Sequence, residues 1–215
     1  MILPFKREDF SYNKEELDKG EYFMAKNVTK KQDEKEESWG KFILDVVVMM
    51  AIILGIFYLL FNFVLSNDRV SGPSMQPTFE DNERLISVRH FTPKRNDVVV
   101  LLAPKAANDV PGALYIKRVI GLPGDKLVSK NDKMYINGKL FKEPYLDNSF
   151  KKADNDAGQT YTSNFTYKVP KGSYYVMGDH RDISKDSHIF GPVKRDALVG
   201  KVVFRYWPFT KIQGF

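Results

Sequence analysis

Val70-Ser71-Gly72-Pro73-Ser74-Met75-Gln76-Pro77-Thr78-Phe79 begins just after a long apolar segment ends. The two prolines each fix one backbone angle, and each biases the residue before it toward extended geometry. Gly72 permits a close backbone approach or an unusual turn. The pattern predicts a stiff loop that holds the Ser74 hydroxyl at a fixed place beside a membrane. The alternative is a tight surface turn, in which Ser, Gly and Pro are common for conformational reasons alone.

Composition limits what kind of protein this is. The chain has 215 residues, of which 43% are apolar and 28% charged, so it is globular rather than disordered throughout. Its net charge of +6 suits nucleic acid or an anionic membrane surface. The lysines are scattered rather than set in one stripe, so we expect a lipid bilayer and no nucleic acid as partner. The absence of cysteine excludes a disulfide framework, a thiol nucleophile and a thiolate metal site. We expect no metal and no cofactor.

Residues 42–65 predict a transmembrane helix. These residues would span about 36 Å as a helix, which exceeds a hydrocarbon core of roughly 30 Å. The alternative, a buried core helix, is disfavoured by the length and by the all-round hydrophobicity. Lysines precede the segment (Lys26, Lys30, Lys31, Lys35 and Lys41), whereas Arg69 is the only basic residue close after it. This asymmetry predicts a cytoplasmic N-terminus, a single uncleaved pass through the cell membrane, and an extracellular domain beyond it.

The expected domains follow from this segment. We expect a cytoplasmic polar tail over residues 1–38, partly helical near residues 14–26, and a transmembrane anchor over residues 39–66. An extracytoplasmic β domain is expected over residues 67–215, with a small β insert at about residues 125–172.

The remainder of the chain carries strand patterns, so the predicted fold is mainly β: one N-terminal transmembrane helix followed by an all-β domain. Asn137-Gly138 predicts a two-residue hairpin turn, because both residues tolerate positive φ. The polar stretch 143–159 predicts an irregular loop. Strands are expected over residues 84–89, 97–102, 114–120, 133–141 (the hairpin), 165–169, 173–177 and 198–207.

Lys117 is unusual because it lies inside an apolar strand. Alternation puts Lys117 on one face with Tyr115 and Val119, and Arg118 on the other. A surface lysine on an edge strand is the commoner alternative. A lysine held in an apolar site has a lowered pKa, and we expect it to be neutral at pH 7. A neutral lysine accepts a hydroxyl proton, so a serine beside it becomes a nucleophile.

Three segments in order, residues 71–78, 115–125 and 178–187, resemble the main motifs of type I signal peptidases. They read Ser-Gly-Pro-Ser-Met-Gln-Pro-Thr, Tyr-Ile-Lys-Arg-Val-Ile-Gly-Leu-Pro-Gly-Asp and Gly-Asp-His-Arg-Asp-Ile-Ser-Lys-Asp-Ser, and Gly191-Pro-Val193 follows. These enzymes are membrane-bound Ser/Lys proteases that cleave signal peptides from exported preproteins. A short chain with one anchor looks like the Gram-positive form, in which the insert is small.

The resemblance implies roles for individual residues. It implies that Ser74 is the nucleophile and Lys117 the general base, and that the backbone N–H of Ser74 holds the oxyanion. In the last motif it implies a serine, Ser184, that hydrogen-bonds the lysine, and an aspartate, Asp186, that supports the site. Further support positions are Gly72, Asp179 and Arg181, with Asp179 paired to Arg118. Positions matching the family's substrate-binding pockets are Val70, Met75, Phe79, Tyr115 and Ile116.

The sequence departs from the family pattern at four positions. Gly72 offers no side-chain donor to the oxyanion. His188 stands where arginine is usual, which alters the salt bridge with Asp186. His180 and Ile183 replace typical asparagines, and Ile183 removes polar support near Ser184.

Two alternatives from other classes stay open. Some homologues encoded with pilus genes have lost the catalytic pair and act in assembly, with pilin or secretion machinery as partners. Ser/Lys chemistry also occurs in self-cleaving repressors of related fold, although the transmembrane helix argues against that. Ser74 and Lys117 argue against the assembly role, and the altered last motif keeps it open.

Overall fold

The computed structural model describes residues 14–215, apart from the side chains of residues 14–18, 20 and 31–38. It divides after Tyr58 into two compact units, each described here by itself. The described residues of the first unit belong to one continuous helix, α1 (Lys14–Leu59), 46 residues long. Its apolar part runs on into a short π-helix, η1 (Leu60–Val64).

The helix is longer than the sequence pattern indicated. The polar tail was expected to be only partly helical near residues 14–26, but α1 starts at Lys14 and continues unbroken. No proline occurs between Pro4 and Pro73, and glutamate and lysine favour helix in the polar half. Residues 1–13 of the expected tail lie outside the described residues.

Among residues 14–215, one helical segment is long and apolar enough to cross a membrane. Within Trp39–Val64, an 18-residue window has a mean hydropathy of 2.7, and none of this window is buried inside the protein. Its C-terminal limit falls one residue before the predicted end at Leu65, because Leu65 begins strand β1 and pairs with Val88.

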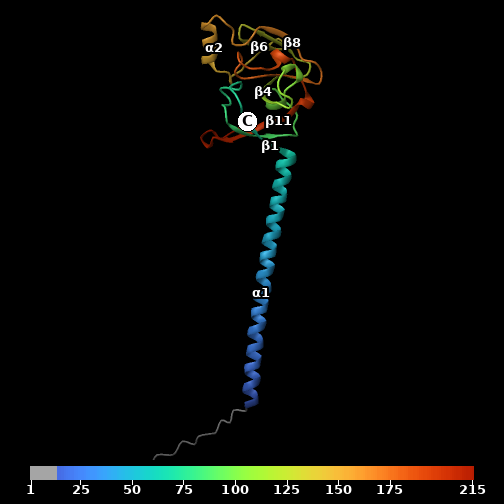
Figure 1. Cartoon of the computed structure of the whole chain (residues 1–215), viewed down its shortest axis with the longest axis vertical. Coiled ribbons are helices and arrows are strands. Elements are labelled where there is room, and N and C mark those ends of the chain that lie inside the picture. Colours follow the sequence, from blue (N-terminus) through green and yellow to red (C-terminus); the bar gives the residue numbers. More distant parts are fainter. Residues whose placement is uncertain (1–13) are drawn as a thin grey trace, which may run out of the picture. The chain divides into compact units, whose positions relative to one another are not determined.

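The second unit contains two antiparallel sheets (Figure 1). The larger sheet has the order β1-β2-β11-β3-β4-β9-β10, and β12 pairs with β11. Its strands are β1 (Leu65–Arg69), β2 (Arg84–Val88), β3 (Val98–Leu102), β4 (Leu114–Gly121), β9 (Ser173–Met177), β10 (Val193–Lys194), β11 (Leu198–Trp207) and β12 (Gln213–Gly214). The predicted mainly β fold behind one apolar helix is confirmed.

The smaller sheet lies at the opposite end of this unit from β1 (Figure 1). It has the order β7-β6-β5-β8, with β5 (Lys126–Lys130), β6 (Lys133–Ile136), β7 (Lys139–Phe141) and β8 (Phe165–Lys168). Asn137 and Gly138 take positive φ and join β6 to β7, as the hairpin prediction required. Strands β8 and β9 flank one turn yet belong to different sheets, so this turn joins the two sheets.

The polar stretch 143–159 is not wholly irregular, because it contains helix α2 (Asn148–Asp156). The side chain of Asp147 accepts a hydrogen bond from the Ser149 backbone N–H, which caps the start of the helix. The remaining short helices are η2 (Lys105–Ala107), α3 (Ser187–Phe190), η3 (Arg195–Ala197) and η4 (Phe209–Lys211).

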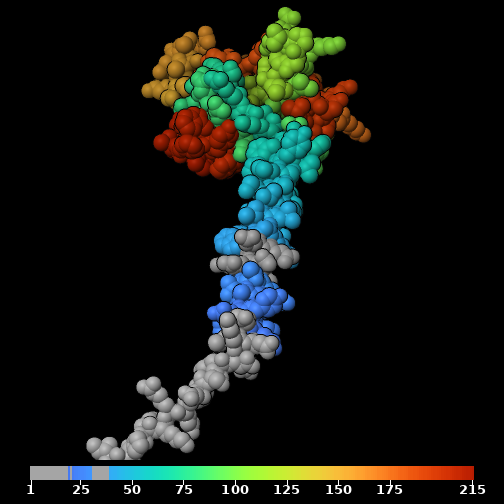
Figure 2. Space-filling view, turned by 60° about the horizontal axis from the view of Figure 1, so that its bottom comes forward, coloured from blue at the N-terminus to red at the C-terminus, as the bar shows by residue number. Residues whose placement is uncertain are grey.

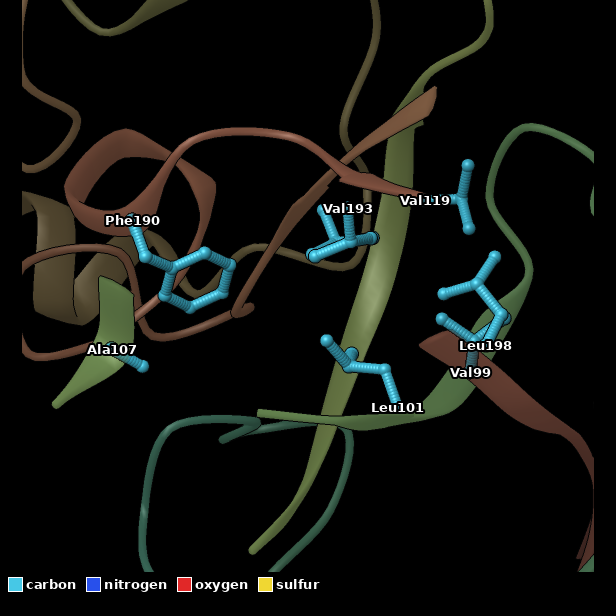
Figure 3. Close-up of a cluster of buried hydrophobic side chains, with 8 residues drawn as sticks. Val99, Leu101, Ala107, Val119, Phe190, Val193 and Leu198 are labelled. Carbon is cyan, nitrogen blue, oxygen red and sulfur yellow. The ribbon is translucent and has the colours of Figure 1, made fainter. Parts of the chain in front are cut away.

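The larger sheet is buried on both faces. Along β3, Val99 and Leu101 pack into one cluster with Val119, Phe190 and Leu198 (Figure 3). Val98 and Val100 pack on the other face with Val70, Met75 and Phe79, three residues of the Ser74 loop. Burial on both faces explains the continuous β-branched run of β3. It also anchors the Ser74 loop to the sheet at both ends.

Candidate active site

Ser74 and Lys117 are brought together from positions 43 residues apart. The Lys117 Nζ lies 2.8 Å from the Ser74 Oγ. Lys117 is on β4, opposite Val99 of β3, and is only 3% exposed. The Ser74 loop is closed by the Val70 N–H, which donates to the Glu83 carbonyl. A rigid strand and an anchored loop therefore meet at one hydroxyl and one amine.

The environment of Lys117 changes its protonation. Burial lowers its pKa from 10.5 to about 8, and the charges of Asp186 and Asp179 partly oppose this shift. No described carboxylate pairs directly with its amine. With a pKa of about 8, roughly a tenth of the lysine is neutral at pH 7. The predicted direction is therefore found, although the neutral form is the minority at pH 7 and becomes the majority above pH 8.

The loop of residues 178–186 packs against the nucleophile. The backbone N–H of His180 donates to the Ser74 carbonyl at 3.1 Å. Gly178 sits so close that a β-carbon there would overlap both the Ser184 hydroxyl and the Ser74 carbonyl. No described residue accepts a hydrogen bond from the backbone N–H of Ser74, so this donor is available to a ligand. The arrangement fixes the Ser74 carbonyl and leaves its N–H free.

Arg118, the neighbour of Lys117, is buried as an ion pair. Its guanidinium donates to both oxygens of Asp179, at 2.8 and 2.6 Å. Thr78 lies between them, since its hydroxyl accepts from Arg118 and donates to Asp179. This contact joins the Ser74 loop to the 178–186 loop. The pairing of Asp179 with Arg118 was expected from the family pattern, whereas the part played by Thr78 was not.

The aspartate at position 186 supports the 178–186 loop through several donors. One Asp186 oxygen accepts from the Gly178 N–H at 2.8 Å, and the other is 2.7 Å from the His188 Nδ1. The hydrogen bond that the His188 ring donates to Asp186 raises the pKa of His188. Histidine therefore keeps a contact to this aspartate where the family pattern has arginine.

Gly72, the other support position in the Ser74 loop, has a φ of 84° and donates its N–H to the Asp81 side chain.

Ser184 departs from the role that the family pattern implied. Its hydroxyl is buried and has no hydrogen-bond partner among the described residues. The expected bond to Lys117 is therefore not formed in this structure, in which the lysine amine contacts the Ser74 hydroxyl. Ile183, beside it, is half exposed.

Two residues that the sequence analysis missed, Glu143 and Tyr145, contact the arginines that hold the 178–186 loop. Glu143 pairs with the buried Arg181, whose Nε donates to the Gly178 carbonyl at 3.0 Å. The ring of Tyr145 lies over the Arg118 guanidinium, 4.0 Å from it, and its hydroxyl donates to Glu143. In the sequence these residues appear only as Glu143-Pro144-Tyr145 after the hairpin, at the start of a polar stretch. No local pattern reveals their contacts, because their partners lie far along the chain.

A cleft of about 290 Å³ opens onto the Ser74 and Lys117 side chains. Tyr115 closes part of it, with its hydroxyl held by Asp109 at 2.6 Å. Phe79 does not line the cleft, because it is fully buried and packs against Phe215. The lining comprises Arg69, Val70, Ser71, Ser74, Met75, Asp109, Leu114, Tyr115, Ile116, Lys117, Ile183 and Lys185. Four of the five expected substrate-binding positions thus border one cleft.

The described part of the chain contains no group of three or more His, Cys, Asp or Glu residues that could hold a metal ion. A serine hydroxyl against a partly neutral amine, with an open backbone N–H beside it, can carry out acyl transfer by itself.

Comparison with known proteins gives a consistent result. The profile of the family described as "Signal peptidase, peptidase S26" matches residues 43–207. Signal peptidase IB of Staphylococcus aureus (strain COL) is 38% identical over 188 residues, covering 80% of this chain and 94% of the relative. Signal peptidase I of Streptococcus pneumoniae (strain ATCC BAA-255 / R6) is 34% identical over 209 residues, covering 83% and 96%. A crystal structure of a signal peptidase I from Enterococcus faecalis V583, 33% identical, aligns with a TM-score of 0.44 over 52% of this chain and 97% of that one.

Proposed function

Since the chain belongs to the signal peptidase family, peptidase S26, we propose that it is a membrane-bound serine endopeptidase that removes signal peptides from exported preproteins with a Ser74/Lys117 dyad. One observation carries this proposal: the Ser74 Oγ lies 2.8 Å from the amine of a lysine that is buried without a carboxylate partner. An ordinary surface lysine stays protonated at pH 7 and takes no proton from serine.

The first half of the reaction forms an acyl-enzyme. The neutral Lys117 amine takes the Ser74 proton while the Ser74 Oγ attacks the scissile carbonyl carbon. The resulting oxyanion accepts a hydrogen bond from the open Ser74 N–H, since Gly72 contributes no side-chain donor. The protonated lysine then gives its proton to the leaving amine as the peptide bond breaks. Serine is left esterified, and Lys117 is neutral again.

The second half releases the signal peptide. Lys117 takes a proton from a water molecule, and the resulting hydroxide attacks the ester carbonyl. Collapse of this intermediate breaks the ester bond, and Lys117 returns the proton to the Ser74 oxygen. One lysine thus serves both steps, which requires that it lose and regain one proton at the same place.

The cleft supports an extended substrate with small side chains near the bond. An added strand fits beside residues 70–72 and beside Tyr115 and Ile116, because both segments border the cleft. Val70 and Met75 belong to the lining and are almost fully buried, so only a small apolar surface of each is left for a substrate side chain. This supports the family's preference for small residues at the first and third positions before the cut.

The proposal includes a topology. Residues 1–38 lie in the cytoplasm, residues 39–66 form the anchor, and residues 67–215 form the extracellular catalytic domain with its insert at about residues 125–172. The apolar segment Trp39–Val64 and the lysines before it support this arrangement. Trp207 and Phe209 are exposed aromatic residues that suit the membrane interface.

Nothing in the site favours the pilus-assembly alternative, because both members of the dyad are present and in contact.

The testing experiment is cleavage of a preprotein with an Ala-X-Ala site by the full chain in detergent. Wild type is expected to cut at this site, whereas Ser74→Ala and Lys117→Ala do not. Lys133→Ala, at an exposed lysine of β6, is the matched control and should cut like wild type. Absence of cutting by folded wild type would overturn the proposal.

A further inference from the structure

A second cavity, of about 470 Å³, is larger than the cleft at the dyad and shares no lining residue with it. In Figure 2 the C-terminal residues, in red, lie beside the green segment that contains the Ser74 loop. Contacts of Arg205 with Thr78 and of Phe215 with Phe79 join these two segments. The lining of this cavity consists of Pro77, Thr78, Arg118, Tyr145, Arg205, Lys211, Gln213 and Phe215.

Three cations converge on this cavity from separate elements. Arg118 of β4 and Arg205 of β11 both contact Thr78, through its hydroxyl and its carbonyl respectively. Lys211 of η4 adjoins Arg205, whose Nε donates to the Lys211 carbonyl at 2.8 Å. No carboxylate side chain belongs to the lining. A cleft lined by one sign of charge raises the local concentration of ions of the opposite sign.

The acidic partners lie outside the lining and hold the arginines in place. Arg118 pairs with the buried Asp179, and Arg205 pairs with the buried Glu83. Lys211 pairs with the exposed Glu80 and is itself 40% exposed. The arginines are thus rigid, while the lysine is at the surface and can turn to a ligand.

The polar atoms left open in this cavity are donors. The Gln213 side-chain carbonyl and the Thr78 backbone carbonyl each already accept from Arg205. The hydroxyls of Thr78 and Tyr145 each donate to a carboxylate. The Gln213 amide N–H pair has no acceptor among the described residues, and the Lys211 ammonium, which pairs with Glu80, has further N–H groups to donate. A ligand with acceptor oxygens and negative charge complements these donors.

The apolar surroundings narrow the class of ligand. Pro77 and the Phe215 ring form part of the wall, and Phe209 and Ile212 beside Lys211 are 70% and 54% exposed. The space exceeds what a single inorganic ion fills and falls in the range of small-molecule pockets. We infer that this cavity binds the phosphate head group of an anionic phospholipid, with the exposed apolar residues beside its acyl chains. The lipid source rests on the membrane location proposed above.

Direct binding tests this inference without reference to peptidase activity. The full chain in a neutral detergent is titrated calorimetrically with dihexanoyl-phosphatidylglycerol, with the phosphatidylcholine of the same chains, and with inorganic phosphate. Phosphatidylglycerol should bind best. Lys211→Gln should weaken it about tenfold, because one charge-assisted hydrogen bond is lost. Lys211→Arg should stay within about threefold of wild type, since the charge is kept.

Lys171→Gln, at an exposed lysine outside the cavity, is the matched control and should bind like wild type. Equal affinity of Lys211→Gln and Lys171→Gln would overturn the site. Preference for inorganic phosphate over phosphatidylglycerol would overturn the lipid assignment. Ser74→Ala should bind phosphatidylglycerol normally. The two proposals can fail separately. If wild type cuts no preprotein, and Lys211→Gln still binds phosphatidylglycerol more weakly than wild type does, the proposed function is refuted and the lipid site is supported.

Discussion

Lys117 and Arg118 are neighbours on one strand, both are buried, and they border different cavities. Arg118 is held as a cation by both oxygens of Asp179. Lys117 has a serine hydroxyl as its partner, and burial lowers its pKa to about 8. The difference teaches that a buried cation is stabilised when a carboxylate pairs with it, as at Arg118. A cation buried without such a pair, as at Lys117, has a lowered pKa. A pKa of about 8 allows Lys117 to exchange a proton near neutral pH.

The largest expected effect comes from making Lys117 resemble its neighbour. Lys117→Arg places a group that stays protonated at the site, so proton transfer from Ser74 is lost. Cleavage should fall on the order of 10⁴-fold or more. The measurement is single-turnover cleavage of a preprotein at pH 8, with Lys126→Arg as an exposed control in β5. Activity within tenfold of wild type would mean that another group is the base.

Breaking the paired side should damage stability instead. Asp179→Ala leaves the Arg118 charge buried without its partner, which should lower the free energy of unfolding by about 3–5 kcal/mol. Urea denaturation of the full chain in detergent measures this. The double variant Asp179→Ala/Arg118→Met should recover at least half of the loss, because no unpaired charge remains. Failure of the second substitution to restore stability would show that the ion pair is not what matters there.

The unpaired side should show the opposite sign. The folded state binds the Lys117 proton less tightly than the unfolded state, so Lys117 costs stability fully below about pH 8 and less as pH rises toward 10.5. Lys117→Met should therefore raise the free energy of unfolding by about 1–3 kcal/mol at pH 7. The gain should shrink between pH 8 and 10.5. A variant no more stable than wild type at pH 7 would contradict the lowered pKa.

The sequence permitted the first half of this comparison and not the second. Strand alternation separates Lys117 from Arg118, and the Asn137-Gly138 turn and the β-branched run of β3 are local patterns that a short window contains. Glu143, Tyr145 and the walls of the second cavity depend on contacts across 27 to 127 residues, which no local pattern encodes. Helix α2 was missed because it is short and its cap, Asp147, sits in a polar run.

The 178–186 loop, which contacts both Ser74 and Arg118, provides a smaller effect that depends on pH. The hydrogen bond that the His188 ring donates to Asp186 raises the pKa of His188 in the folded state. Its stabilisation is therefore complete below about pH 6.5 and is lost as pH rises through the folded pKa. His188→Gln should cost about 1 kcal/mol at pH 5.5 and less at pH 9. Unfolding at both pH values measures this, and a loss that grows with pH would refute it. The sense is opposite to that of Lys117.

The smallest expected effect concerns Ser184, which the family pattern assigns to the lysine side. Its buried hydroxyl bonds to nothing among the described residues, so Ser184→Ala removes no hydrogen bond and should change the free energy of unfolding by less than about 0.5 kcal/mol. Ser187 is the matched control, since it is equally buried and its Oγ accepts from the Val176 N–H at 3.0 Å. Ser187→Ala should cost about 1 kcal/mol. If Ser184→Ala costs as much as Ser187→Ala, and the midpoint of the pH–rate profile also moves, then Ser184 bonds Lys117 in solution. Lys117 would then have a second hydrogen-bond partner, and its contrast with the ion-paired Arg118 would be smaller.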